Sequence, residues 1–288
     1  MRTLTKIILA SIAVAFISVK WSTPSFQSET LQGARVLVTG ASTGIGEQMA
    51  YHYARFGAQL VITARREKVL QQVVEKCLSL GAQKALYIAG DMATESDPDK
   101  VVEFTLEKLG GLDYLVLNHI GPTPFSVWKG DIEHTRWLMK VNFFSYVQMA
   151  WKALPSLEQS KGSLVIVSSF VGKVAGPLTA PYTATKSALN GFFGSLQHEL
   201  AMKNSNVSLS ICTLGLIDTE TAMEKIKGIV NNVPAAPASE AALNIIKTGA
   251  TRQAELYYPY NTYIITLIKD WNPAVTNYLI RRTYNYNP

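Results

Sequence analysis

The residues best suited to chemistry are a tyrosine and a lysine four positions apart, Tyr182 and Lys186. Pro181 suits a first helical position and the following residues suit a helix, so the two side chains should lie one turn apart on the same face. A nearby ammonium stabilises a phenolate, so we expect the pKa of Tyr182 to fall from about 10 toward neutrality. Such a phenol could act as a general acid or base. The spacing also arises by chance, so its meaning depends on its surroundings.

A second hydroxyl group precedes this pair in the chain. The apolar run 164–167 is typical of a buried parallel strand, and Ser168 and Ser169 follow it directly. Ser169 stands thirteen residues before Tyr182. The carboxyl end of this strand is therefore the place where we look for a site.

The elements that must position these residues alternate between strands and helices. Alternation of this kind predicts an α/β fold, a Rossmann-type doubly wound parallel sheet of about seven strands with helices on both faces. Strands are expected at 34–40, 59–64, 84–89, 112–117, 164–167, 207–212 and 255–258, and helices at 44–56, 67–81, 97–109, 131–158 and 182–203. Since no linker divides the body, we expect a single domain at 33–258, a polar connector at 22–32 and a helical, aromatic-rich tail at 259–288.

The first expected strand ends in a glycine-rich turn, Gly40-Ala41-Ser42-Thr43-Gly44-Ile45-Gly46. Glycines between a strand and a helix let the backbone approach a pyrophosphate at the helix N-terminus. The turn therefore predicts a dinucleotide site formed by Gly40, Ser42, Thr43, Gly44, Ile45 and Gly46.

The end of the second expected strand selects the dinucleotide. Arg65 stands nineteen residues after Gly46 with no adjacent carboxylate, and an arginine here suits a ribose 2′-phosphate. We therefore expect Arg65, helped by Ser42, to favour NADP(H); the alternative is a solvated basic helix start. Asp91 follows the third strand and either bonds the adenine amine or caps the next helix.

Composition excludes several other classes of function. The chain has 288 residues and a net charge of +6, but no run of Lys or Arg exceeds two residues. A nucleic-acid partner is therefore not expected. The two cysteines, Cys77 and Cys212, provide neither metal-ligand spacing nor a disulfide framework, so no metal is expected.

The N-terminal segment 1–21 has the pattern of secretory targeting. Arg2 and Lys6 precede an apolar run at 7–19, which Lys20 closes. The run is shorter than the ~20 residues that span a bilayer, which favours a signal peptide, although flanking residues could extend it into a membrane anchor. A buried N-terminal helix is the alternative. The excess of positive charge before the run predicts a lumenal body, and the sequon at Asn206 fits that location.

Taken together, the glycine turn, Asn118 after the fourth strand, Asn142, Ser169 and the Tyr182–Lys186 pair resemble the short-chain dehydrogenase/reductase family over about 33–258. Residues 117–120, 182–193 and 214–221 are similar to its 11β-hydroxysteroid dehydrogenase type 1 branch, and 31–36 and 111–121 are most similar to the type-1-like paralogues. The resemblance implies NADP(H)-dependent hydride transfer between nicotinamide and a steroid hydroxyl or ketone of the cortisol/cortisone type. It also implies a homodimer anchored in the endoplasmic reticulum membrane with a lumenal catalytic domain, or a secreted protein if segment 1–21 is cleaved.

The same resemblance implies a role for each residue. Tyr182 would exchange a proton with the substrate oxygen, and Ser169 would hydrogen-bond that oxygen. Lys186 would lower the Tyr182 pKa and bind the nicotinamide ribose, and Asn142 would hold a water that links Lys186 to solvent. The remaining expected cofactor contacts are Met92, Asn118, Leu214, Ile217, Thr219 and His119, which we expect to pack beside the cofactor rather than to catalyse.

Two positions depart from the type 1 pattern. Thr43 stands where those enzymes carry a lysine near the 2′-phosphate, which implies a softer preference for NADP(H). Gly176 stands where they carry a tyrosine that lines the steroid site, which implies a wider or reshaped pocket and leaves the steroid open. We expect a short helix at 222–230 to form a substrate lid. The apolar tail could pack on the core, join a dimer or rest on the membrane surface.

Two other functions compete with a steroid dehydrogenase. One keeps the chemistry but uses retinoids or other lipid carbonyls as substrates. The other is a cofactor-binding protein with little turnover. The presence of Ser169, Tyr182 and Lys186 together argues against the second.

Overall fold

The computed structural model describes residues 25–231 and 233–285. Seven parallel strands form its central sheet in the order β3-β2-β1-β4-β5-β6-β9, which confirms the predicted doubly wound fold. The chain runs outward from β1 to β3, then returns to add β4 and the strands beyond it. The strands are β1 (Arg35–Thr39), β2 (Gln59–Ala64), β3 (Lys84–Ala89), β4 (Tyr114–Leu117), β5 (Ser163–Ser169), β6 (Ser208–Leu214) and β9 (Glu255–Tyr258).

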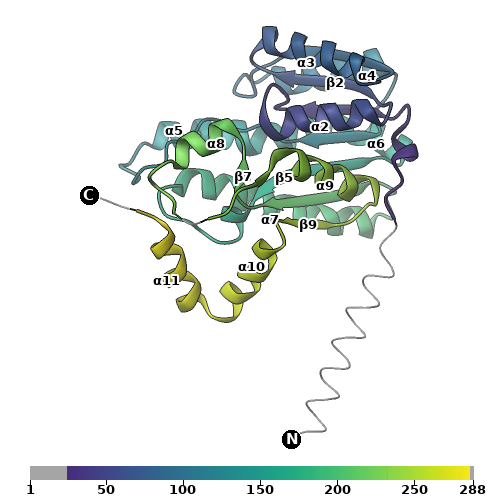
Figure 1. The fold of residues 1–288 in the computed structure, drawn as a ribbon. Helices are drawn as coiled ribbons and strands as arrows, with labels where there is room; N and C mark the ends of the chain where they lie inside the picture. The colour runs from purple at the N-terminus through teal and green to yellow at the C-terminus, as the bar shows by residue number, and fades with distance from the viewer. Residues whose placement is uncertain (1–24, 232, 286–288) are drawn as a thin grey trace, which may run out of the picture.

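Helices cover both faces of this sheet (Figure 1). On one face α2 (Gly44–Arg55), α3 (Glu67–Ser79) and α9 (Ala238–Ala250) bury one hydrophobic core against the strands. On the other face a second core lies beneath α4 (Asp97–Leu109), α6 (Ser145–Ser160) and α7 (Ala180–Met202). Because both faces are buried, the central strands are apolar throughout rather than alternating.

The long helix expected at 131–158 is interrupted. The structure divides it into α5 (Ile132–Met139), a π-helical turn η2 (Lys140–Phe144) and α6. A π turn inserts an extra residue into the helix and is often found at functional sites. Asn142 lies in this turn, and its side chain is fully buried.

The shorter elements lie mainly around the carboxyl end of the sheet. After β6 the two-residue strand β7 (Ile217–Asp218) pairs with β8 (Ala236–Pro237), and α8 (Glu220–Ile226) occupies the expected lid position between them. Two 3-10 turns are η1 (Ser28–Leu31) and η3 (Phe170–Gly172).

The expected tail forms two helices, α10 (Asn261–Trp271) and α11 (Pro273–Thr283), which project from the body (Figure 1). Within 25–231 and 233–285 no helix is both long enough and apolar enough to cross a bilayer. The predicted signal peptide or anchor at 1–21 lies outside the described residues.

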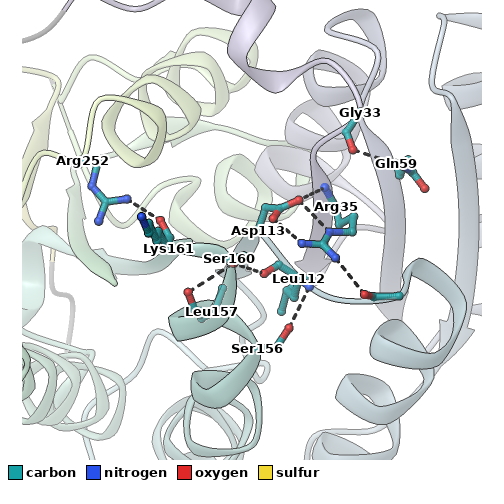
Figure 2. Close-up of polar contacts among 11 residues, drawn as sticks. Gly33, Arg35, Gln59, Leu112, Asp113, Ser156, Leu157, Ser160, Lys161 and Arg252 are labelled. Atoms are coloured by element: carbon teal, nitrogen blue, oxygen red, sulfur yellow. Dashed lines mark hydrogen bonds and ion pairs between the residues drawn. The ribbon is translucent and has the colours of Figure 1, made fainter. Parts of the chain in front are cut away.

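An ion pair joins β1 to the start of β4 at the amino end of the sheet (Figure 2). Arg35 Nε donates to Asp113 Oδ2 over 3.0 Å and Nη2 to Oδ1 over 2.7 Å, while Nη1 donates to the Gly110 carbonyl. Partial burial acts to raise the Asp113 pKa, but the hydrogen bonds from Arg35 outweigh it and hold that pKa below its ordinary value. This bidentate pair holds β1 and β4 together at their amino ends. The predicted site lies at the other, carboxyl end of the sheet.

We predict that Asp113→Asn lowers the free energy of unfolding by about 1–2 kcal/mol at neutral pH, because the variant loses a charge-assisted pair. The native pKa of Asp113 is depressed, so its contribution is present above the unfolded value near 4 and is lost as the pH falls through the native value. The two proteins should therefore begin to converge in stability near pH 4 and become equal only below the native pKa of Asp113. Urea unfolding at several pH values measures this difference. Glu107→Gln, which removes an exposed pair with Lys108, is the control and should change stability little.

Candidate active site

Helix α7 places Tyr182 and Lys186 on one face, as the spacing predicts. It begins at Ala180 with Pro181 in its first turn, so both residues lie near its N-terminal end. Their side chains line a cavity of about 350 Å³ at the carboxyl end of the sheet. Ser169, at the end of β5, lines the same cavity. The structure therefore brings together the three residues that the sequence singled out.

Lys186 is held in position by the backbone of β5. Its Nζ donates to the Val167 carbonyl over 2.8 Å, and only 1% of the residue is exposed. The ammonium nitrogen lies 5.7 Å from the centroid of the Tyr182 ring and 5.6 Å from that of Tyr146. Burial lowers the pKa of Lys186 to about 7, so near neutrality it is divided between its charged and neutral forms.

The pKa of Tyr182 moves in the direction opposite to our expectation. Burial raises it to about 12, and a hydrogen bond with the Ser169 hydroxyl opposes this only in part. Loss of water around the phenolate therefore outweighs this hydrogen bond. As a result, Tyr182 retains its proton throughout the physiological pH range and is poised as an acid.

Asn142 connects three parts of the site through its buried amide. Its Oδ1 accepts from the Gly121 amide over 2.7 Å, and its Nδ2 donates to Thr185 Oγ1 over 3.2 Å. It thereby ties the π turn to the loop after β4 and to helix α7. These contacts position Lys186, the neighbour of Thr185; the water relay that the resemblance implies for Asn142 stays a prediction.

The glycine turn after β1 fits a dinucleotide. Gly40 and Gly44 have φ of +66° and +63°, a region that strains other residues. A side chain at Gly46 would collide with the Gly40 carbonyl, so the turn needs a glycine there to pack tightly. The first amides of α2 have no partner within their helix and suit a pyrophosphate. Because Ile45 of this turn lines the cavity, a dinucleotide could extend from the turn into the cavity.

The arginine that contacts this turn is Arg66 rather than Arg65. Arg66 Nη2 donates to Ser42 Oγ over 3.1 Å and to Thr43 Oγ1 over 3.2 Å. Arg65 is exposed, and no hydrogen bond or ion pair holds it among the residues that the structure describes. The sequence could not tell which of the two guanidinium groups turns back toward β1, and the contact of Arg65 with a 2′-phosphate stays a prediction.

Asp91 does not cap helix α4, whose N-cap is Ser96. Its Oδ1 instead accepts from the Ala93 amide over 3.0 Å, which stabilises the turn after β3. This removes the capping alternative. The adenine contact of Asp91 stays a prediction, as does the contact of the neighbouring, buried Met92.

His119 is a packing residue, as expected. Its Nδ1 lies 2.8 Å from Thr39 Oγ1 and its Nε2 lies 2.8 Å from Ser145 Oγ. Burial, with a smaller effect of Lys186, lowers its pKa to about 3, so the imidazole is neutral. Its neighbour Asn118 donates through Nδ2 to the Thr39 carbonyl and lines the cavity.

The cavity divides the predicted residues into two groups. Those that line it are Ile45, Asn118, Ser169, Gly176, Tyr182, Lys186, Leu214, Ile217 and Thr219. Those outside its lining are Gly40, Ser42, Thr43, Gly44, Gly46, Arg65, Asp91, Met92, His119 and Asn142. Most of the second group surrounds the glycine turn and the ends of β2 and β3, where a dinucleotide's adenosine half would lie. His119 and Asn142 instead lie behind the cavity, at the loop after β4 and in the π turn.

Comparison with known proteins identifies the family. The sequence profile of the family described as short chain dehydrogenase matches residues 34–229. The chain belongs to the short-chain dehydrogenase family. It is thus an oxidoreductase that acts on CH–OH groups.

Relatives within the family share much of the sequence. A Danio rerio protein named hydroxysteroid 11-beta-dehydrogenase 1-like protein is 64% identical over 288 residues, 100% of both chains. The proteins of the same name from Gallus gallus and Homo sapiens are 59% and 52% identical; the first match covers 88% of each chain, and the second covers 77% of this chain and 70% of the human protein.

Solved structures of short-chain dehydrogenases share the fold. One from Burkholderia phymatum in complex with NAD has a TM-score of 0.75 at 17% identity and covers 85% of this chain and 95% of its own. Another from Burkholderia cenocepacia in complex with NADP has a TM-score of 0.70 at 25% identity and covers 79% and 96%.

Sequence reasoning missed the part of this short-chain dehydrogenase site that the chain's own tail provides. Ile280, Thr283 and Tyr284 line the cavity. The Tyr284 hydroxyl lies 2.8 Å from the position of a Cβ built on Gly176. The space that glycine leaves open is therefore occupied by Tyr284, so of the two alternatives expected at Gly176 the structure shows a reshaped pocket rather than a wider one on that side. No local pattern brings residues so far apart in sequence together.

We predict that Gly176→Ala displaces the Tyr284 ring, because a methyl group 2.8 Å from its hydroxyl oxygen is too close. The Michaelis constant for the alcohol or ketone substrate should rise a few-fold with little change in kcat. Steady-state kinetics measures both constants.

Adding Tyr284→Phe removes the clashing oxygen and should restore most of the substrate affinity. Gly194→Ala, on α7 with open space around its Cα, is the matched control. Equal effects of Gly176→Ala with and without Tyr284→Phe would contradict this steric account.

Proposed function

We propose that the protein is an NADP(H)-dependent oxidoreductase that transfers a hydride between nicotinamide and a hydroxyl or ketone group of a steroid. The observation that carries the proposal is the placement of Ser169, Tyr182 and Lys186 in one mainly apolar cavity beside the glycine turn. A cavity of about 350 Å³ suits a rigid, lipophilic molecule held by few polar groups. The names of the relatives support a steroid as that molecule.

The cofactor would lie along the carboxyl end of the sheet. The glycine turn would hold its pyrophosphate, and Asn118, Ile217 and Thr219 would hold the nicotinamide half, since they line the cavity. When bound, the nicotinamide supplies or accepts the hydride. The protein contributes orientation and a dry, preorganised environment.

In the reductive direction, Tyr182 donates its phenolic proton to the substrate oxygen as the adjacent carbon is reduced. The Ser169 hydroxyl donates a hydrogen bond to the same oxygen and stabilises its developing negative charge. Lys186 uses one N–H to bond Val167, and its positive charge stabilises the phenolate that remains. Oxidation runs these steps in reverse and needs the phenolate at the start. The raised pKa of Tyr182 keeps the phenol protonated near neutral pH, as the reductive step requires.

The preference for NADP(H) is supported by the basic end of β2. Arg66 already bonds the hydroxyl groups of Ser42 and Thr43, so its guanidinium lies at the turn where a 2′-phosphate would sit. Arg65 adds a second positive charge close by. Together they replace the lysine that type 1 enzymes carry at the Thr43 position.

The homodimer, the membrane contact and the location in the secretory pathway stay predictions. Exposed aromatic residues on α6 and α7, among them Trp151 and Phe192, support an interface between copies. Trp271 and Leu279, on the projecting helices α10 and α11, support contact with a membrane surface. Asn206 is exposed, as a glycosylated sequon in the lumen requires.

The activity itself is tested by following nicotinamide absorbance with NADPH and cortisone, and with NADP⁺ and cortisol. We predict that Tyr182→Phe lowers the rate at least 100-fold while leaving cofactor affinity nearly unchanged, because only the transferable proton is lost. The exposed Tyr260 provides the matched control, Tyr260→Phe, with an unaltered rate. Turnover of retinoids but not steroids would favour the lipid-carbonyl alternative, and a normal rate in Tyr182→Phe would remove Tyr182 from its role.

A second prediction concerns the cofactor. Arg66→Ser should raise the Michaelis constant for NADPH about 5- to 30-fold and leave that for NADH little changed, since a charge-assisted phosphate contact contributes about 1–2 kcal/mol. Arg65→Asp should raise the same constant and shift preference toward NADH. The control is Lys76→Ser, an exposed lysine in the last turn of α3. If both arginine variants keep the native preference for NADPH, neither arginine reads the 2′-phosphate.

A further inference from the structure

A lysine side chain lies in the apolar wall of the substrate cavity. Lys225, on the lid helix α8, lines the cavity together with Ala222 and Ile226 of the same helix and Val230 beyond it. Lys225 is half-buried, whereas the nearby Glu224 and Lys227 are exposed. The mechanism above makes no use of this cation.

No residue that the structure describes neutralises Lys225. Its ammonium group takes part in none of the salt bridges formed within 25–231 and 233–285. Burial lowers the pKa of Lys225, with no opposing effect from a carboxylate. A cation that has lost part of its water without gaining a partner is unfavourable, and such groups are normally paired. A bound ligand could supply the missing anion.

The position of Lys225 separates it from the expected phosphates. The N-cap of α8 is Thr219, whose methyl group lies 3.1 Å from a Cβ built on Gly44 of the glycine turn. Lys225 is six residues further along, which is about 9 Å along a helix axis. The chain then runs to Ile229 and Asn231, whose backbones bond Asn285 and Thr283 of the tail. Lys225 thus lies toward the lid-and-tail end of the cavity, away from the pyrophosphate.

We propose that Lys225 is a substrate-specificity residue, and that it pairs with a carboxylate carried by the substrate at the end remote from the reacting carbon. The inference rests on the proposed function, because it takes the cavity as the substrate site. It narrows the substrate class to lipophilic, steroid-like ketones or alcohols that bear an acidic side chain. The apolar wall holds the ring system, and the single cation selects the acid.

A matched pair of substrates tests this inference: a keto-steroid with a side-chain carboxylate and its methyl ester. The wild-type protein should prefer the acid by about tenfold in kcat/KM with NADPH. Lys225→Met should abolish that preference, mainly through the Michaelis constant of the acid, and leave the ester unaffected. Lys227→Met, which removes an exposed lysine from the end of the same helix, should retain the preference. A tenfold loss corresponds to about 1.4 kcal/mol.

Binding without turnover separates this inference from the proposed function. In the Tyr182→Phe background, the dissociation constants of acid and ester are measured by calorimetry with and without Lys225→Met. Acid binding that depends on Lys225 supports the inference even if no ketone is reduced by the native protein. Equal affinity of acid and ester in both proteins overturns it. A rise in the Michaelis constant for NADPH, equal with both substrates, also overturns it, because Lys225 would then serve the cofactor.

Discussion

The chemistry of this protein depends on the removal of water from two groups one helical turn apart. Burial raises the pKa of Tyr182 and lowers that of Lys186, so each is driven toward its neutral form. A phenolate–ammonium pair forms when the pKa of the phenol lies below that of the ammonium. The two shifts act in the opposite sense, because they place the pKa of Tyr182 above that of Lys186. A site with this balance holds a protonated acid, and a positive charge beside it becomes most favourable when the phenol gives up its proton.

The parallel sheet explains why these groups meet. Strands β1, β4, β5 and β6 are neighbours in the parallel sheet, so their carboxyl ends lie side by side. The residues that follow or end these strands are therefore close in space although they are widely separated in sequence: the glycine turn, Asn118, Ser169 and Leu214. Helix α7 then returns Tyr182 and Lys186 to the end of β5, where the Val167 carbonyl fixes the lysine. The bidentate pair of Arg35 and Asp113 joins β1 to the start of β4 at the opposite end of the strands.

The sequence predicts well those features that local spacing determines. The order of strands and helices, the glycine turn and the i, i+4 relation of Tyr182 to Lys186 follow from short patterns. It fails where the answer depends on packing between distant segments. The sign of the Tyr182 pKa shift requires knowledge of burial, and the contact of Arg66 with the glycine turn requires a side-chain direction. The division of the 131–158 helix by a π turn has no recognisable local signal.

The same reasoning explains the substrate end of the site. The cavity wall at this end comes from the lid helix α8 and from tail residues near the C-terminus. No sequence motif indicates that these two segments lie together. Backbone hydrogen bonds of 2.9 Å from Asn231 to Thr283 and 2.7 Å from Asn285 to Ile229 join the tail to the segment after α8. At about 0.5–1.5 kcal/mol each, these bonds help to hold the tail against the segment after α8. The tail therefore shapes the cavity, and at both departures from the type 1 pattern, Thr43 and Gly176, the structure places a side chain from elsewhere in the fold, Arg66 and Tyr284.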